Sequence, residues 1–167
     1  MTASRYEKYI VRKPAIIKSV TPGHISIEVP KGDKIPAMSS VDTGPLVIFS
    51  NDFLKDATTK VEYGFIMGDT SIGAGKGFGA HKHDYGEIFL FLGTNPRDTN
   101  YLGAEAEYWL GEGEELEKVK FNTSSSVYVP PRVAHFPLIW RNVKSPVMMV
   151  VIVPTTSDHK AIPVRRE

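Results

Sequence analysis

The chain has 167 residues, of which 41% are hydrophobic and 23% charged, and its 20 lysines and arginines are balanced by 19 acidic residues. This composition is typical of a globular domain with one core, and it gives no electrostatic indication of a nucleic acid or anionic membrane partner. Cysteine is absent, which excludes disulfides and thiolate metal sites. The N-terminus is charged where a secretory signal is apolar, and the longest apolar run, Val147–Val153, is too short to cross a membrane, so we expect a cytoplasmic protein.

Three regions follow one another along the chain. Residues 1–40 contain weak strand signals and four prolines, and we expect them to form an arm that packs on the main domain or on a second subunit. Residues 41–157 are expected to form one barrel, and residues 158–167 a C-terminal tail. Only Asn51–Ala57 has the pattern of a helix, of at most two turns.

Short segments rich in Val, Ile, Phe and Tyr alternate with Gly and Pro, and this pattern predicts strands. Many short strands without long helices favour an all-β antiparallel sandwich or jelly-roll barrel over a βαβ architecture. The expected strands are Ile25–Val29, Leu46–Phe49, Val61–Met67, Glu87–Leu92, Ala106–Leu110, Leu116–Phe121, Val127–Val129, Phe136–Trp140 and Val147–Val153.

The most informative segment contains His81, His83 and Glu87. Residues two apart in a strand point to the same face, so both histidines can aim inward and converge on one ion. Asp84-Tyr85-Gly86 has the composition of a tight turn, which would start a second strand at Glu87 and return its carboxylate to the two imidazoles.

A second segment repeats this arrangement. An apolar strand that ends at Val129 is followed by Pro130-Pro131 and then by His135 at the start of a returning strand. The four residues together predict a divalent metal site of three histidines and one carboxylate. Glu87 is open to a second interpretation, as a general base beside a metal held by the three histidines alone.

These two segments resemble the motifs of the cupin superfamily, in which two histidines one residue apart, a glutamate and a later histidine bind the metal. The resemblance runs from about Val61 to Val153 and includes Gly75 and Pro130 at motif positions. Arg132 stands where the second motif usually has glycine, which would carry a steric penalty if a positive φ is required there. The resemblance is to small single-domain bacterial cupins without an assigned reaction.

The resemblance implies one Fe, Mn, Zn or Ni ion and chemistry on a small polar or carboxylated molecule, by a dioxygenase, decarboxylase, lyase or isomerase. Glu87 and Tyr85 are the candidate catalytic residues that would manage protons. The alternative is a non-catalytic module in which the metal anchors a small ligand. Arg132 and Arg141 lie close in sequence to His135 and are candidate substrate anchors, because a guanidinium binds a carboxylate bidentately.

Two further expectations concern the surroundings of the site. The glycine-rich segment 75–80 is expected to form a loop at the barrel mouth. The N-terminal arm and an aromatic-rich sheet face both need burial, which predicts a homodimer.

Overall fold

The computed structural model describes residues 6–12, 15–21, 24–29, 46–51, 53–74, 79–155 and 160–165. Much of the expected arm, including residues 1–5 and 30–40, and most of the glycine-rich segment, residues 75–78, lie outside the described residues. The described chain is all-β, and its helical elements are two 3-10 turns, η1 (Glu7–Tyr9) and η2 (Gly113–Glu115). In the described part of Asn51–Ala57 separate turns replace the expected helix, because only isolated bonds such as Ala57 N to Leu54 O form there.

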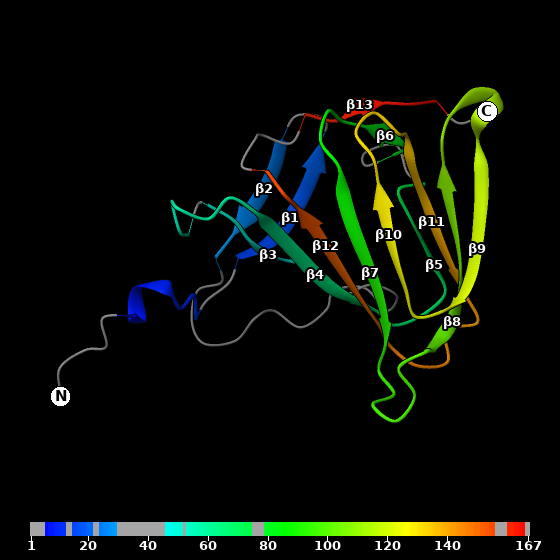
Figure 1. Ribbon diagram of the computed structural model, residues 1–167, viewed down its shortest axis with the longest axis horizontal. Coiled ribbons are helices and arrows are strands. Elements are labelled where there is room, and N and C mark those ends of the chain that lie inside the picture. The colour runs from blue at the N-terminus through cyan, green and yellow to red at the C-terminus, as the bar shows by residue number, and fades with distance from the viewer. Residues whose placement is uncertain are drawn as a thin grey trace.

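The described residues form thirteen strands. These strands make up two antiparallel sheets, which face each other in Figure 1. The first sheet has the order β10-β7-β12-β4-β3-β1-β2, and the second has the order β13-β6-β11-β8-β9, with β5 also paired to β11. The strands are β1 (Ala15–Thr21), β2 (His24–Glu28), β3 (Val47–Phe49), β4 (Lys60–Ile66), β5 (Thr70–Ile72), β6 (His81–Lys82), β7 (Glu87–Gly93), β8 (Tyr101–Leu110), β9 (Glu117–Thr123), β10 (Ser125–Val129), β11 (His135–Arg141), β12 (Val147–Val153) and β13 (Ile162–Pro163).

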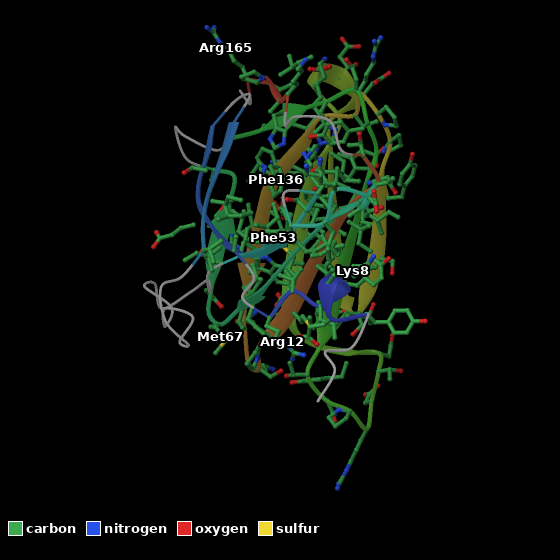
Figure 2. All side chains as sticks on the ribbon, turned by 90° about the vertical axis from the view of Figure 1, so that its left-hand side faces the viewer. Lys8, Arg12, Phe53, Met67, Phe136 and Arg165 are labelled. Atoms are coloured by element: carbon green, nitrogen blue, oxygen red, sulfur yellow. The ribbon has the colours of Figure 1, made fainter. Side chains whose placement is uncertain are left out.

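The core lies between the two sheets, and strand alternation decides which side chains enter it. Along β12, alternate residues from Val147 to Val153 are buried, as expected for a strand with one face on a core. Aromatic rings fill much of the interior, with Phe91 and Trp140 in edge contact at 5.5 Å between ring centres. Figure 2 shows side chains crowded between the sheets, with Phe136 inside and Arg165 outside.

Two corners connect the sheets at one end of the barrel. The turn after β6 passes from the second sheet to β7 in the first, and the turn after β10 passes from the first sheet to β11 in the second. In Figure 1, β6 and the β10–β11 turn lie together at the top. The two expected turns are therefore corners rather than hairpins, and this brings both histidine segments to the same barrel mouth.

The first sheet continues through residues expected to form the arm. Strands β1 and β2 pair with each other, and β1 pairs with β3, so this segment extends the barrel sheet. The outer face of the same sheet is apolar, with cross-strand rows such as Leu90–Val150–Tyr63 on β7, β12 and β4. Within the described ranges, no helix has the length and apolar character that a membrane crossing requires.

Candidate metal centre

Three histidines meet at the barrel mouth. His81 begins β6, His83 follows that strand, and His135 begins β11 directly opposite His81 in the register. Their side chains are all buried, and His135 is fully enclosed. One ring nitrogen of each lies within 4.8 Å of those of the other two. The structure thus brings together the three histidines that were expected to bind a metal.

The backbone orients all three rings in the same way. Nδ1 of His81 donates a hydrogen bond to the carbonyl oxygen of Gly79 at 2.9 Å. In the same way, Nδ1 of His83 donates to the carbonyl oxygen of Tyr85 at 2.6 Å, and Nδ1 of His135 donates to that of Val133 at 3.2 Å. Because a carbonyl oxygen only accepts, Nδ1 carries the proton, and a neutral ring presents its lone pair at Nε2. Nε2 of His135 is buried and makes no hydrogen bond within the described chain. This is the ring orientation that metal-binding histidines use.

Glu87 lies between two of these imidazoles. It begins β7 opposite Val129, and its Oε1 lies 3.2 Å from Nε2 of His83 while its Oε2 lies 3.4 Å from Nε2 of His135. Burial by itself raises the pKa of the Glu87 carboxyl, but interactions with His135 and His83 outweigh burial and lower it to about 2. A carboxylate facing two Nε2 atoms requires a shared positive charge, from an imidazolium proton or from a cation.

The distances suit a first-row divalent metal ion. Because the three ring nitrogens lie no more than 4.8 Å apart, an ion placed between them could be within about 2.8 Å of each nitrogen. A metal–imidazole bond is roughly 2.1 Å long. Shifts below about 1 Å would therefore complete the coordination. Imidazole nitrogen with carboxylate oxygen is a donor set for Zn, Fe, Mn or Ni, and it does not select among them.

Arg132 connects the turn after β10 to the turn after β6 through two hydrogen bonds. Its backbone N donates to the carbonyl oxygen of His83 at 2.7 Å, and its Nε donates to Oδ1 of Asp84 at 2.9 Å. Its φ is 68°, so the residue adopts the left-handed conformation that the usual glycine would accept at lower cost. The side chain is 80% exposed and already paired with Asp84. Its expected role as a substrate anchor remains a prediction.

Tyr85 lies directly beside the histidines. Its ring stacks on that of His83, with centres 4.0 Å apart and planes 11° from parallel. Burial, followed by the negative charges of Glu87 and Glu62, raises the pKa of the Tyr85 phenol above its usual 10.0. The phenol therefore stays protonated at neutral pH. A catalytic role for Tyr85 remains a prediction.

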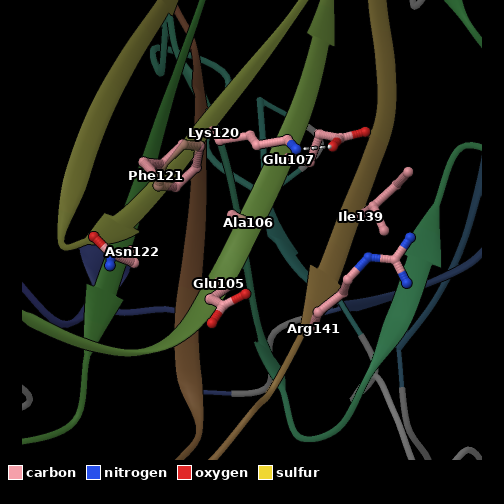
Figure 3. A pocket seen from close by; sticks show the side chains of 8 residues that line it. All are labelled: Glu105, Ala106, Glu107, Lys120, Phe121, Asn122, Ile139 and Arg141. Carbon is pink, nitrogen blue, oxygen red and sulfur yellow. Dashed lines mark ion pairs between the residues drawn. The ribbon is translucent and has the colours of Figure 1, made fainter.

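The structure does not bring Arg141 to the histidines. The register of β11 against β8 shifts between His135 and Leu138, so the two ends of β11 do not keep one alternation. Arg141 is exposed, whereas the preceding Trp140 is buried. Arg141 instead lines a surface pocket of about 350 Å³ formed by residues of β8, β9 and β11. Figure 3 shows its side chain among the other residues that line this pocket. The pocket is lined by Glu105, Ala106, Glu107, Lys120, Phe121, Asn122, Ile139 and Arg141.

Glu62 is a second acidic group near the site that the sequence did not indicate. On β4 it pairs with Val151 of β12, whose next neighbour is Phe89 of β7. Val151 and Phe89 are both buried, so Glu62 faces the barrel interior from a row adjacent to Glu87. Burial and the charge of Glu87 raise the pKa of Glu62 to about 7. The sequence alone did not indicate Glu62 because its neighbours Val61 and Tyr63 are hydrophobic, and alternation in a strand would favour placing the hydrophobic side chains on the core side.

No protein-family model and no curated protein sequence matches this chain. Solved structures do match in their fold. Vicilin from Corylus avellana (hazelnut) superposes with a TM-score of 0.51 at 12% identity, covering 72% of this chain and 31% of vicilin. A point mutant of the oxalate decarboxylase OxdC from Bacillus subtilis superposes with a TM-score of 0.52 at 10% identity, covering 78% of this chain and 30% of OxdC.

CapF in complex with the inhibitor 3-isopropenyl-tropolone superposes with a TM-score of 0.52 at 14% identity, covering 83% of this chain and 37% of CapF. This chain thus spans about a third of the length of each of these proteins. At such low identity the similarity concerns the fold alone. All three are cupin-fold proteins, and the two antiparallel sheets described above match them over most of this chain. The chain therefore has the cupin jelly-roll fold.

Proposed function

We propose that the protein is a metal-dependent enzyme that acts on a small polar or carboxylated molecule. The metal would be one divalent transition ion, held through Nε2 of His81, His83 and His135, with Glu87 as a fourth ligand. The observation that carries this proposal is that three backbone carbonyls accept hydrogen bonds from the three Nδ1 atoms, while one ring nitrogen of each buried histidine lies within 4.8 Å of those of the other two.

The residues around the site have separate tasks in this proposal. Bound in this way, the ion would act as a Lewis acid that polarises an oxygen atom of the substrate. Glu87 would balance the charge of the ion and hold the ring planes of His83 and His135. Tyr85, protonated and stacked on His83, would donate a hydrogen bond to substrate or return a proton to it. Four protein ligands leave about two of six octahedral positions for substrate.

The comparison with oxalate decarboxylase supports an enzyme, because it shows that this fold can support a reaction on a small dicarboxylate. The fold itself does not specify the reaction. Dioxygenation, decarboxylation, elimination and isomerisation are all compatible with a chelated oxygen-rich substrate and a nearby proton donor. The dependence of turnover on oxygen separates dioxygenation from the other three.

The test combines elemental analysis of the purified protein with a turnover screen in air and under nitrogen. We expect about one transition metal ion per chain, and far less in His135→Ala, because a whole coordinate bond is lost. His24→Ala is the matched control, since His24 lies on β2 at the far edge of the first sheet. Full metal content in His135→Ala would contradict the proposed site. Metal and ligand binding without turnover would favour the non-catalytic alternative.

A further inference from the structure

The phenol of Tyr108 is a buried hydrogen-bond donor without an acceptor in the described chain. Tyr108 lies on β8, its side chain has 0% exposure, and its Oη makes no hydrogen bond to any described residue. Protein interiors rarely leave a buried hydroxyl unpaired, because it has lost its hydrogen bonds to water and gained none in return. An acceptor from outside the described chain is therefore required.

The position of Tyr108 connects it to the metal centre. In the β8–β11 register Leu110 is opposite His135 and Tyr108 is opposite Leu138, so Tyr108 occupies the next inward-facing position on β8. Its ring contacts Phe136 at 5.6 Å, and the Phe136 ring lies 5.1 Å from that of His135. The ring of Phe136 therefore connects Tyr108 to His135, and Tyr108 lies on the interior side of the site.

The surroundings of Tyr108 are apolar apart from the site itself. Phe89 and Phe91 also pack against its ring, at 5.6 and 6.3 Å. Burial and the charge of Glu87 raise the pKa of the Tyr108 phenol well above its usual 10.0, so the hydroxyl keeps its proton. A protonated phenol among aromatic rings suits an acceptor oxygen at the end of a compact molecule, and it suits a polyhydroxylated molecule poorly.

We propose that Tyr108 is a substrate-binding residue, whose hydroxyl donates a hydrogen bond to a carboxylate oxygen of a small molecule chelated at the metal centre. This inference rests on the proposed function, and it narrows the substrate to compact carboxylates. The competing explanation is that a buried water accepts the hydrogen bond of Tyr108. Trp140 lies opposite Ala106, two residues before Tyr108 on β8, and its Nε1 is likewise a buried donor with no acceptor among the described residues.

The experiment uses Tyr108→Phe, which removes the hydroxyl and keeps the ring. Wild type and variant are loaded with Co(II) and titrated with oxalate, pyruvate and salicylate, with visible absorption reporting binding. Azide serves as an anion that binds metal without a carboxylate. We expect Tyr108→Phe to bind the carboxylates about tenfold more weakly or worse, with unchanged cobalt content and azide affinity. Tyr128→Phe, at a phenol that is 60% exposed, should leave every affinity unchanged.

Thermal unfolding without carboxylate provides a readout independent of ligand. If the hydroxyl has no partner until substrate binds, Tyr108→Phe should unfold at the same temperature as wild type or higher. A lower melting temperature with unchanged carboxylate affinity would overturn the proposal in favour of a buried water. Wild type that binds cobalt but none of the three carboxylates would overturn the substrate class alone. Wild type that binds no cobalt would overturn the metal centre itself.

Discussion

The carboxyl group of Glu62 makes the stability of the metal-free protein depend on pH. Burial and the nearby Glu87 raise its pKa from 4.5 to about 7, while Lys60 opposes the shift. Between these two values the folded protein holds a proton that the unfolded chain has released. Its contribution to stability is therefore fully present below pH 4.5 and is lost as the pH rises through 7.

The size of this effect follows from the shift in pKa. A change from 4.5 to about 7 corresponds to about 3 kcal/mol of lost stability at pH 8, as an upper limit. Glu62 is only partly buried, so solvent screening reduces this to about 1–2 kcal/mol. Glu62→Gln keeps the shape and removes the ionisation. We expect it to be about 1–2 kcal/mol more stable than wild type at pH 8 and nearly equal to it at pH 4.

Urea denaturation of both proteins at pH 4 and pH 8, with a chelator present, measures these differences. Glu105→Gln is the matched control, because it makes the same substitution at an exposed position on the outside of β8. Adding a divalent cation at pH 8 should shrink the advantage of Glu62→Gln, since the cation offsets the charge of Glu87. An equal difference between Glu62→Gln and wild type at both pH values would refute the reasoning.

Three further predictions concern Arg132 and the apolar sheet face. Arg132→Gly removes the cost of the left-handed backbone, about 1 kcal/mol, and loses an exposed ion pair that contributes about 0–1 kcal/mol. The melting temperature of Arg132→Gly should therefore equal or exceed that of wild type, and it should exceed that of Arg132→Ala. Arg132→Ala should retain full metal content in elemental analysis, because Arg132 supplies no proposed ligand. The outer face of β4, β7 and β12 should form the interface of a homodimer, so Val150→Asp should give a monomer by light scattering. A wild-type monomer at micromolar concentration would contradict that interface.

Much of the fold and of the candidate site follows from local sequence signals. The continuous apolar run Val147–Val153 has the same limits as β12, because its length suits a strand and Pro146 and Pro154 bound it on either side. His81 and His83 are separated by one residue, and both are buried as strand alternation predicted, although β6 ends at Lys82. Short strands bounded by turn residues were sufficient to predict an all-β antiparallel sandwich or jelly-roll barrel.

Tertiary structure decided which face of a strand is buried. In β4 the hydrophobic residues Tyr63 and Phe65 alternate with Glu62 and Gly64, and the sequence favours placing the hydrophobic set inside. The structure exposes Phe65 and turns Glu62 inward, because the register with β12 fixes the alternation.

Strand register also separates Arg141 from the histidines. A register shift after His135 changes the alternation of β11, and nothing in the local sequence measures such a shift. Tyr108 likewise became a candidate only when its hydroxyl was found buried without a partner. Local sequence signals identify which residue types can bind a cation. Their convergence, and the polar groups behind them, depend on contacts between strands far apart in the chain, which local patterns do not encode.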